Sequence, residues 1–103
     1  MTLLREARYE EAKAAFRSFL DNYPQSSLVP NAWYWLGESQ STRGSHREAA
    51  RSYLQGYNAD RRGPRAAQNL FRLGVTLGRL GQVGEACLTL REVGTQFPDA
   101  PDD

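Results

Sequence analysis

The sequence repeats itself at a fixed interval of 37 residues. Three alanines, Ala12, Ala49 and Ala86, mark this interval. Other positions at the same spacing carry residues of related character: Leu36-Gly37 and Leu73-Gly74, Gly44 and Gly81, and Phe16, Tyr53 and Leu90. A fixed period of this length is the mark of a helical solenoid, in which each unit packs only against its neighbours. The period therefore predicts a core made of interfaces between consecutive units.

Within each unit the apolar residues recur every three or four positions, which predicts amphipathic helices and no strands. The stripe in the first unit includes Tyr9, Ala12 and Phe16. Gly44 and Gly81 follow the expected ends of two helices, where a left-handed cap favours glycine. The pattern predicts an all-α fold of antiparallel helix pairs, with helices at about residues 1–6, 8–23, 28–43, 46–58, 64–80 and 83–97.

These helices divide the chain into one domain, residues 1–98, and a C-terminal tail, residues 99–103. The domain is expected to contain a partial repeat, 1–26, followed by repeats 27–63 and 64–98. Because the first unit has only the end of its first helix, we expect about two and a half repeats, beginning inside a unit.

Charge and rare residue types exclude several kinds of site. The 13 Lys and Arg residues against 12 Asp and Glu leave a net charge of +1, so no nucleic-acid partner is expected. The single Cys87 and single His46 allow neither an internal disulfide nor a cysteine or multi-histidine metal cage. Ser, Cys and His residues lack a recognisable catalytic spacing, so we expect no enzyme activity and no cofactor. No run of about 18 apolar residues occurs, so no membrane insertion is expected.

Two units carry the motif of a known repeat. The second has Trp33-x2-Leu36-Gly37 and then Ala49-x3-Tyr53; the third has Leu70-x2-Leu73-Gly74, then Ala86-x3-Leu90 and Pro98. This resembles the tetratricopeptide repeat, W-x2-L-G-x2-Y, A-x3-F, P, with a period of about 34 residues. The resemblance implies a tetratricopeptide-type α-solenoid. Small residues such as Gly37 let paired helices approach, and large ones such as Tyr53 fill the space beside them.

Longer sequence segments point to a particular family of tetratricopeptide proteins. The segments RYEEAKAAFRSFLDNYPQS, PNAWYWLGES and LGVTLGRLGQVGEACLTL look like the C-terminal tetratricopeptide domain of the YbgF/CpoB family. Members of that family are periplasmic cell-division coordinators of the Tol-Pal system in Gram-negative bacteria. The resemblance implies a non-catalytic scaffold that binds TolA or another envelope protein, with a link to a penicillin-binding protein. Its implied role is to coordinate cell-wall synthesis with outer-membrane constriction. Members also have a signal peptide and a trimerising coiled coil, neither of which this sequence shows, so trimerisation is expected from a segment outside it.

The same resemblance implies a partner-binding groove, because the first helix of each tetratricopeptide unit lines the concave face. Mapping that face onto this sequence gives Asn31, Tyr34, Trp35, Glu38, Thr42, Gln68, Phe71, Arg72, Val75 and Arg79, extended by Leu4 and Arg5. Tyr34, Trp35 and Phe71 are candidates to anchor apolar groups of a partner, and the two arginines to hold a carboxylate or carbonyl. The alternative is that Trp35 or Phe71 packs inside the stack. With Lys13 as the only lysine, a carboxylate clamp for chaperone tails is disfavoured.

The remaining candidates have structural explanations. Cys87 is expected to be buried on an apolar stripe. His46 is expected at the surface, and Arg61, Arg62 and Arg65 in a solvated turn between units. An alternative function is self-association, because an open repeat end lacks a polar cap.

Overall fold

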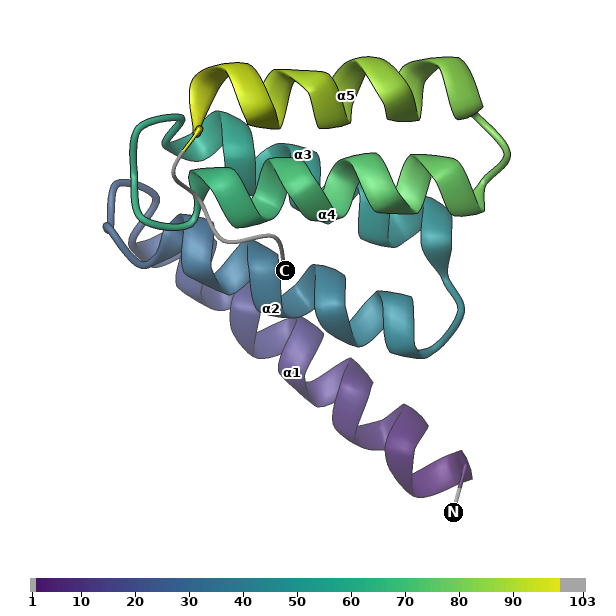
Figure 1. The fold of residues 1–103 in the computed structure, drawn as a ribbon. Coiled ribbons are helices and arrows are strands. Elements are labelled where there is room, and N and C mark those ends of the chain that lie inside the picture. The colour runs from purple at the N-terminus through teal and green to yellow at the C-terminus, as the bar shows by residue number, and fades with distance from the viewer. Residues whose placement is uncertain (1, 99–103) are drawn as a thin grey trace.

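The computed structural model describes the backbone of residues 2–98 and the side chains of residues 8–98. This part of the chain forms five α-helices and no strand (Figure 1): α1 Thr2–Asn22, α2 Val29–Thr42, α3 His46–Ala59, α4 Ala66–Arg79 and α5 Val83–Gln96. The all-α solenoid predicted from the repeat is confirmed. The ends of α2 to α5 lie within two residues of the predicted ones.

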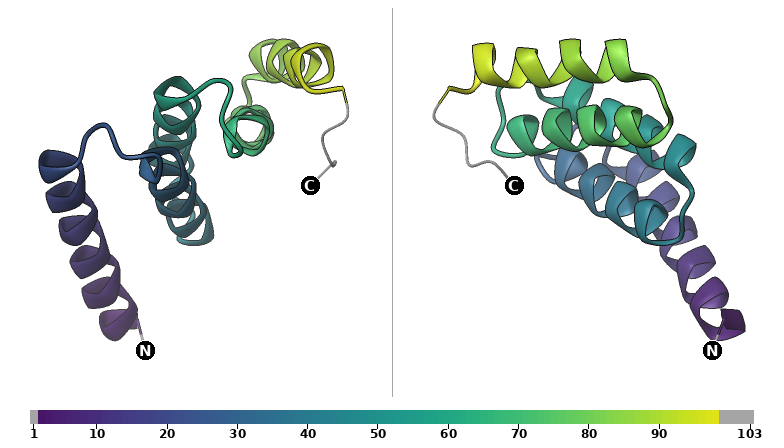
Figure 2. Two further views of the ribbon diagram at one scale, coloured as in Figure 1. Left: turned by 90° about the vertical axis from the view of Figure 1, so that its left-hand side faces the viewer. Right: turned by 45° about the vertical axis from the view of Figure 1, so that its right-hand side comes forward.

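The helices pack as successive antiparallel pairs. α2 pairs with α3, α4 pairs with α5, and α3 packs against α4, so that α2 and α4 also meet on one side. Figure 2 shows this stepped arrangement, with α1 leaning away from the other helices toward its N-terminus. Within the described part of the chain, α1 packs chiefly along α2. The first helices of the two complete units therefore share one surface.

Glycine closes α2 and α4 as predicted. Gly44 has a φ of 83° and Gly81 a φ of 84°, in the left-handed region that favours glycine. The amide of Ser45 donates to the carbonyl oxygen of Gln40 at 2.8 Å, and the amide of Gln82 donates to that of Leu77 at 2.9 Å. These bonds satisfy carbonyl groups that the helix ends leave unpaired. Each cap turns the chain back toward the next helix.

The two helices of the second unit approach closely at Gly37. A Cβ atom on Gly37 would lie only 2.6 Å from Cε1 of Tyr53, whose side chain is 1% exposed. One repeat later Gly74 faces Leu90 in the same way, at 2.6 Å from Cδ2. Ala49 is fully buried. The predicted pairing of small residues with a large neighbour is thus confirmed, and it sets the distance between paired helices.

A buried hydrogen-bond chain joins the first three helices. The side-chain Nε2 of Gln40 donates to the hydroxyl of Tyr9 at 3.1 Å, and the hydroxyl of Ser52 donates to the side-chain Oε1 of Gln40 at 2.6 Å. Nearby, the rings of Phe16 and Trp33 meet edge to face at 4.7 Å. These contacts hold α1 against α2.

The predicted helix break near residue 7 is wrong. α1 runs without interruption from Thr2 to Asn22, whereas two helices, 1–6 and 8–23, were expected. The position that carries the capping glycine in the later units, Gly44 and Gly81, is Ala7 in the first. Alanine has the highest helix propensity and disfavours the left-handed cap, so the helix continues. The side chains of Leu4 and Arg5, expected to extend the groove, lie outside the described residues.

Candidate functional site

The predicted groove residues lie on α2 and α4, and Arg65, which caps α4, links the two helices. Its guanidinium donates to the side-chain oxygen of Asn31 on α2 and to that of Gln68 on α4, the latter at 2.5 Å. The same group lies over the rings of Tyr34 at 4.5 Å and Trp35 at 5.5 Å. Planar guanidinium groups favour such combined stacking and hydrogen bonding.

The expectation that Arg65 lies in a solvated turn is therefore wrong. The turn between α3 and α4 places Arg65 beside α2, which precedes it by more than 20 residues, and the side chain is half-buried. Arg61 remains exposed, and it donates to Asn58 at 2.8 Å. No local signal in the sequence separates the two arginines, because only the packing of α2 against α4 distinguishes them.

The aromatic residues of the groove divide into core and surface. Tyr34 is 6% exposed and packs near Tyr53, with ring centroids 6.2 Å apart, so it supports the surface from below and offers little area to a partner. Trp35 is 57% exposed, which excludes the alternative that it packs inside the stack. The rings of Tyr34 and Trp35 meet edge to face, with centroids 5.2 Å apart. Phe71 is half-buried on α4. Trp35 is thus the main accessible aromatic side chain of this surface.

A second cluster joins α2, α3 and α4 around Glu38. The hydroxyl of Tyr53 donates to the Glu38 carboxylate at 2.5 Å, and Nε of Arg72 lies 3.4 Å from the same oxygen as an ion pair. Burial, the hydrogen bond to Glu38 and the charge of that carboxylate raise the pKa of Tyr53 above its usual value. Burial alone would lower the pKa of Arg72, but a hydrogen bond with Tyr34 and the charge of Glu38 outweigh it and raise the pKa. Arg72 therefore stays charged beside Glu38, although its buried Nε makes no hydrogen bond among the described residues.

The far end of the surface is more open. Arg79 is exposed and its guanidinium donates to Ser41 of α2 at 3.5 Å. Thr42 is exposed and its hydroxyl donates to the backbone of Glu38, one turn earlier in α2. Val75 is half-buried in α4, one turn after Arg72 and one turn before Arg79. The structure thus brings the predicted residues of α2 and α4 onto one face, which we call the α2–α4 surface. It combines an exposed indole with three arginines that each contact α2, a composition suited to binding a peptide segment.

Cys87 and His46 lie on different helices, α5 and α3. Cys87 is exposed, so the prediction that it is buried is wrong. It follows the buried Ala86 on α5, and no further helix of the described chain covers the outer side of α5. His46 is half-buried at the start of α3. Among the described residues, no three His, Cys, Asp or Glu side chains gather to hold a metal ion.

Comparison with known proteins gives matches along the chain. Two family models, both described as tetratricopeptide repeat, match residues 1–64 and 68–100. The chain is similar to the cell division coordinator CpoB of Escherichia coli, with 48% identity over 33 residues, or 32% of this chain and 12% of that protein. It is similar to CpoB of Pseudomonas putida, with 40% identity over 42 residues, or 41% of this chain and 16% of that protein.

The matched segments thus span less than a fifth of the length of these relatives. No helix in residues 2–98 has both the length and the apolar character needed to cross a membrane. The first family model covers more than half of the sequence, residues 1–64 of 103. Paired antiparallel helices, glycine-mediated close approach and these matches lead to one conclusion: the chain belongs to the tetratricopeptide repeat family.

Proposed function

We propose that this chain is a non-catalytic protein-interaction module that acts in cell division. The observation that carries the proposal is the α2–α4 surface, where Trp35 is 57% exposed beside the Arg65 guanidinium, which is hydrogen-bonded to Asn31. On the same surface Arg72 forms an ion pair with Glu38. Tryptophan and arginine dominate the energy of protein interfaces, and side chains held before binding lose less entropy. The similarity to proteins named cell division coordinator supports the cellular role.

In its finer form, the proposal places the module in the periplasm within the Tol-Pal system. There it binds TolA or another envelope protein, with a penicillin-binding protein as a further partner, and coordinates cell-wall synthesis with outer-membrane constriction. The chemistry of the surface favours an extended or helical peptide segment that offers an apolar group to Trp35 and a carboxylate or carbonyl to Arg72. The ion pair with Glu38, at 3.4 Å, leaves the Arg72 side chain 31% exposed.

Calorimetric titration with purified TolA tests whether TolA is a partner and whether the α2–α4 surface binds it. Trp35→Ala removes the exposed indole and is expected to weaken binding by about tenfold or more, and Arg72→Ala by a similar factor. The matched control is Tyr23→Ala, which removes an aromatic side chain of similar exposure, 62%, from a position outside the α2–α4 surface. The control variant should bind as the wild-type chain does.

Unchanged TolA affinity in Trp35→Ala and Arg72→Ala would contradict the α2–α4 surface as the binding site. No binding of TolA to the wild-type chain would contradict TolA as the partner, and crosslink mapping after capture from an envelope extract would then identify the segment that is bound. Self-association through open repeat ends stays the alternative prediction. Sedimentation at two concentrations decides it, because a monomer at both would contradict it.

A further inference from the structure

Three arginines stand at a fixed interval along the α2–α4 surface. Arg65, which caps α4, is followed by Arg72 and Arg79 at steps of seven residues. Seven residues are close to two helical turns, so the three side chains lie on one side of α4. Each of them contacts a side chain of α2. Against these three positive charges, α2 and α4 carry a single acid, Glu38. The surface therefore favours a negatively charged partner segment.

The central arginine is already paired with that acid. Nε of Arg72 lies 3.4 Å from the Glu38 carboxylate, to which the hydroxyl of Tyr53 also donates. A partner carboxylate at Arg72 would lie close to the charge of Glu38, and like charges at such short range repel each other. A carbonyl oxygen accepts from a guanidinium without adding a charge. Because 31% of the Arg72 side chain is exposed, the central position is suited to a backbone carbonyl oxygen of the partner.

The two outer arginines are not balanced in this way. No carboxylate of the described residues lies within 4 Å of Arg65 or Arg79. Arg65 uses Nε and Nη1 on the side-chain oxygens of Asn31 and Gln68, which leaves Nη2 open among the side chains of residues 8–98. Arg79 is exposed and donates, within the same range, only to Ser41. Both ends of the row can therefore bind a carboxylate through charge-assisted hydrogen bonds.

The distance between the outer arginines sets the spacing of the two acids. Arg65 and Arg79 are 14 residues apart, about 21 Å along the axis of α4. Their side chains reach toward Asn31 and Ser41, which are ten residues apart, about 15 Å along α2. The two guanidinium groups are thus separated by about 15–21 Å. An extended chain covers about 19–20 Å in six residues, which falls within this range.

An extended segment suits all three arginines, whereas a helix does not. Acids six residues apart lie on the same side of a β-strand, with its period of two, and of a polyproline II helix, with its period of three. The backbone carbonyls between the acids of such a segment are available to Arg72. In an α-helix these carbonyls are bonded within the helix, so the central arginine would gain no acceptor.

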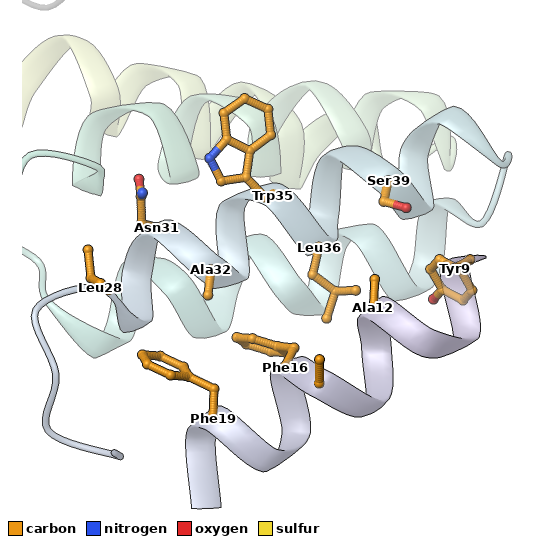
Figure 3. Close-up of a pocket in the computed structure, with 11 residues that line it drawn as sticks. Tyr9, Ala12, Phe16, Phe19, Leu28, Asn31, Ala32, Trp35, Leu36 and Ser39 are labelled. Carbon is orange, nitrogen blue, oxygen red and sulfur yellow. The ribbon is translucent and has the colours of Figure 1, made fainter. Parts of the chain in front are cut away.

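Trp35 adds an apolar contact at the Arg65 end of the row. Its exposed ring lies 5.5 Å from the guanidinium of Arg65. Figure 3 shows Asn31 and Trp35 on the side of α2 that is directed away from Phe16 and Phe19 of α1. A segment bound at Arg65 therefore meets the indole, and an apolar residue next to that acid is favoured.

From these charges and distances we infer that the α2–α4 surface binds an extended segment of a partner protein with two acidic side chains six residues apart, one at Arg65 and one at Arg79, and a backbone carbonyl between them at Arg72. This inference rests on the proposed function. It goes further, because it gives the charge, the spacing and the conformation of the segment that this surface selects.

Synthetic peptides test the charge and the spacing. The probe is an acetylated and amidated peptide, PEPLPAPEP, whose prolines favour an extended chain and whose glutamates are about 19 Å apart. One comparison peptide, PQPLPAPQP, lacks both charges. The other, PEPLPEPAP, has the composition of the probe but places the glutamates only about 12 Å apart and on different sides. Titrated into isotope-labelled protein at low salt, the probe should shift amide resonances of α2 and α4 and bind about fivefold more tightly than either comparison peptide. Salt at about 0.5 M should remove most of that difference.

Two exposed arginines provide matched variants of the protein. Arg79 lies on the α2–α4 surface and Arg91 lies on α5. Arg79→Gln and Arg91→Gln remove the same charge, and both should keep the wild-type circular dichroism spectrum. Arg79→Gln should weaken probe binding by about threefold and remove the preference for PEPLPAPEP over PEPLPEPAP, because only one acid can then be paired. Arg91→Gln should leave both unchanged.

Three outcomes overturn the inference: no amide shift in α2 or α4 at millimolar probe, equal binding of PEPLPAPEP and PEPLPEPAP, or equal effects of the two variants. Each is distinct from a failure of the proposed function. If TolA binding depends on Trp35 and Arg72 while the spacing of the acids has no effect, the acid spacing is wrong and the binding surface stands. If TolA does not bind but the probe is preferred, TolA is excluded as the partner and the acid spacing stands.

Discussion

Replacing Gly37 with alanine tests whether the repeat glycine is required by the close approach of α2 and α3. The new Cβ would lie 2.6 Å from Cε1 and 2.8 Å from Cδ1 of Tyr53. The ring has little freedom to move away, because the residue is 1% exposed and its hydroxyl lies 2.5 Å from Glu38. Overpacking a core costs about 1–3 kcal/mol, whereas exchanging glycine for alanine within a helix gains about 0.5–1 kcal/mol. We therefore expect Gly37→Ala to lower the free energy of unfolding by about 1–2 kcal/mol.

Urea denaturation followed by far-ultraviolet circular dichroism measures this change, and the melting temperature should fall by about 4–8 °C for each kcal/mol in a domain of this size. The matched control is Gly94→Ala in α5, where a Cβ would meet nothing within 4 Å. The free energy of unfolding of that variant should rise by about 0.5–1 kcal/mol from helix propensity alone. Gly74→Ala should cost less than Gly37→Ala, because its neighbour Leu90 is 38% exposed and free to shift.

If Gly37→Ala proves as stable as Gly94→Ala, the reasoning is refuted. The distance between paired helices would then adjust at little cost, and the glycine of the repeat would need another explanation.

Three further predictions concern single side chains. Tyr53→Phe should lower the free energy of unfolding by about 1.5–3 kcal/mol near neutral pH, because it removes a hydrogen bond to a carboxylate. Since the pKa of Tyr53 is raised on folding, this stabilisation is present below about pH 10 and declines above it. Chemical denaturation over a pH series should therefore show the difference in unfolding free energy between wild type and Tyr53→Phe decreasing at alkaline pH. Gly44→Ala should lower the melting temperature, because the φ of 83° at Gly44 disfavours any residue with a Cβ, even though that Cβ would meet no atom within 4 Å. Gly94→Ala again serves as the control. Native Cys87 should react with a thiol reagent about as fast as the urea-unfolded chain does, and strong protection would contradict its exposure.

The sequence predicts the fold well wherever one repeat can be compared with another. Gly44 and Gly81 mark the ends of α2 and α4, and the positions of Gly37 and Tyr53 predict which helices approach closely. Such features are local or recur at a fixed interval, so they can be read from the chain without coordinates. The exception is Ala7, where the capping residue is missing and α1 simply continues.

The surface is less predictable, because exposure depends on helices distant in the sequence. Arg65 and Arg61 stand in one turn, yet only Arg65 reaches α2 and Asn31. Tyr34 and Trp35 are neighbours, yet one is buried and the other exposed. Cys87 lies beside the buried Ala86 but one step around α5, on a side that no described helix covers. A periodic pattern gives the direction of a side chain around its helix, and the packing of neighbouring helices then decides its burial.

The attachment of α1 has a consequence for how the molecule opens. α1 is held by few contacts, among them the Phe16–Trp33 ring pair and the Tyr9–Gln40 hydrogen bond, whereas α3 is enclosed by α2 and α4. Solenoids lose structure unit by unit, and segments with few buried contacts open at the lowest free energy. Hydrogen exchange should therefore proceed through detachment of α1 well before global unfolding, with the amides of α3 exchanging last. A protein bound against α1 would suppress this detachment, so binding at this end of the domain would be detected as slower exchange in the helix that otherwise detaches first.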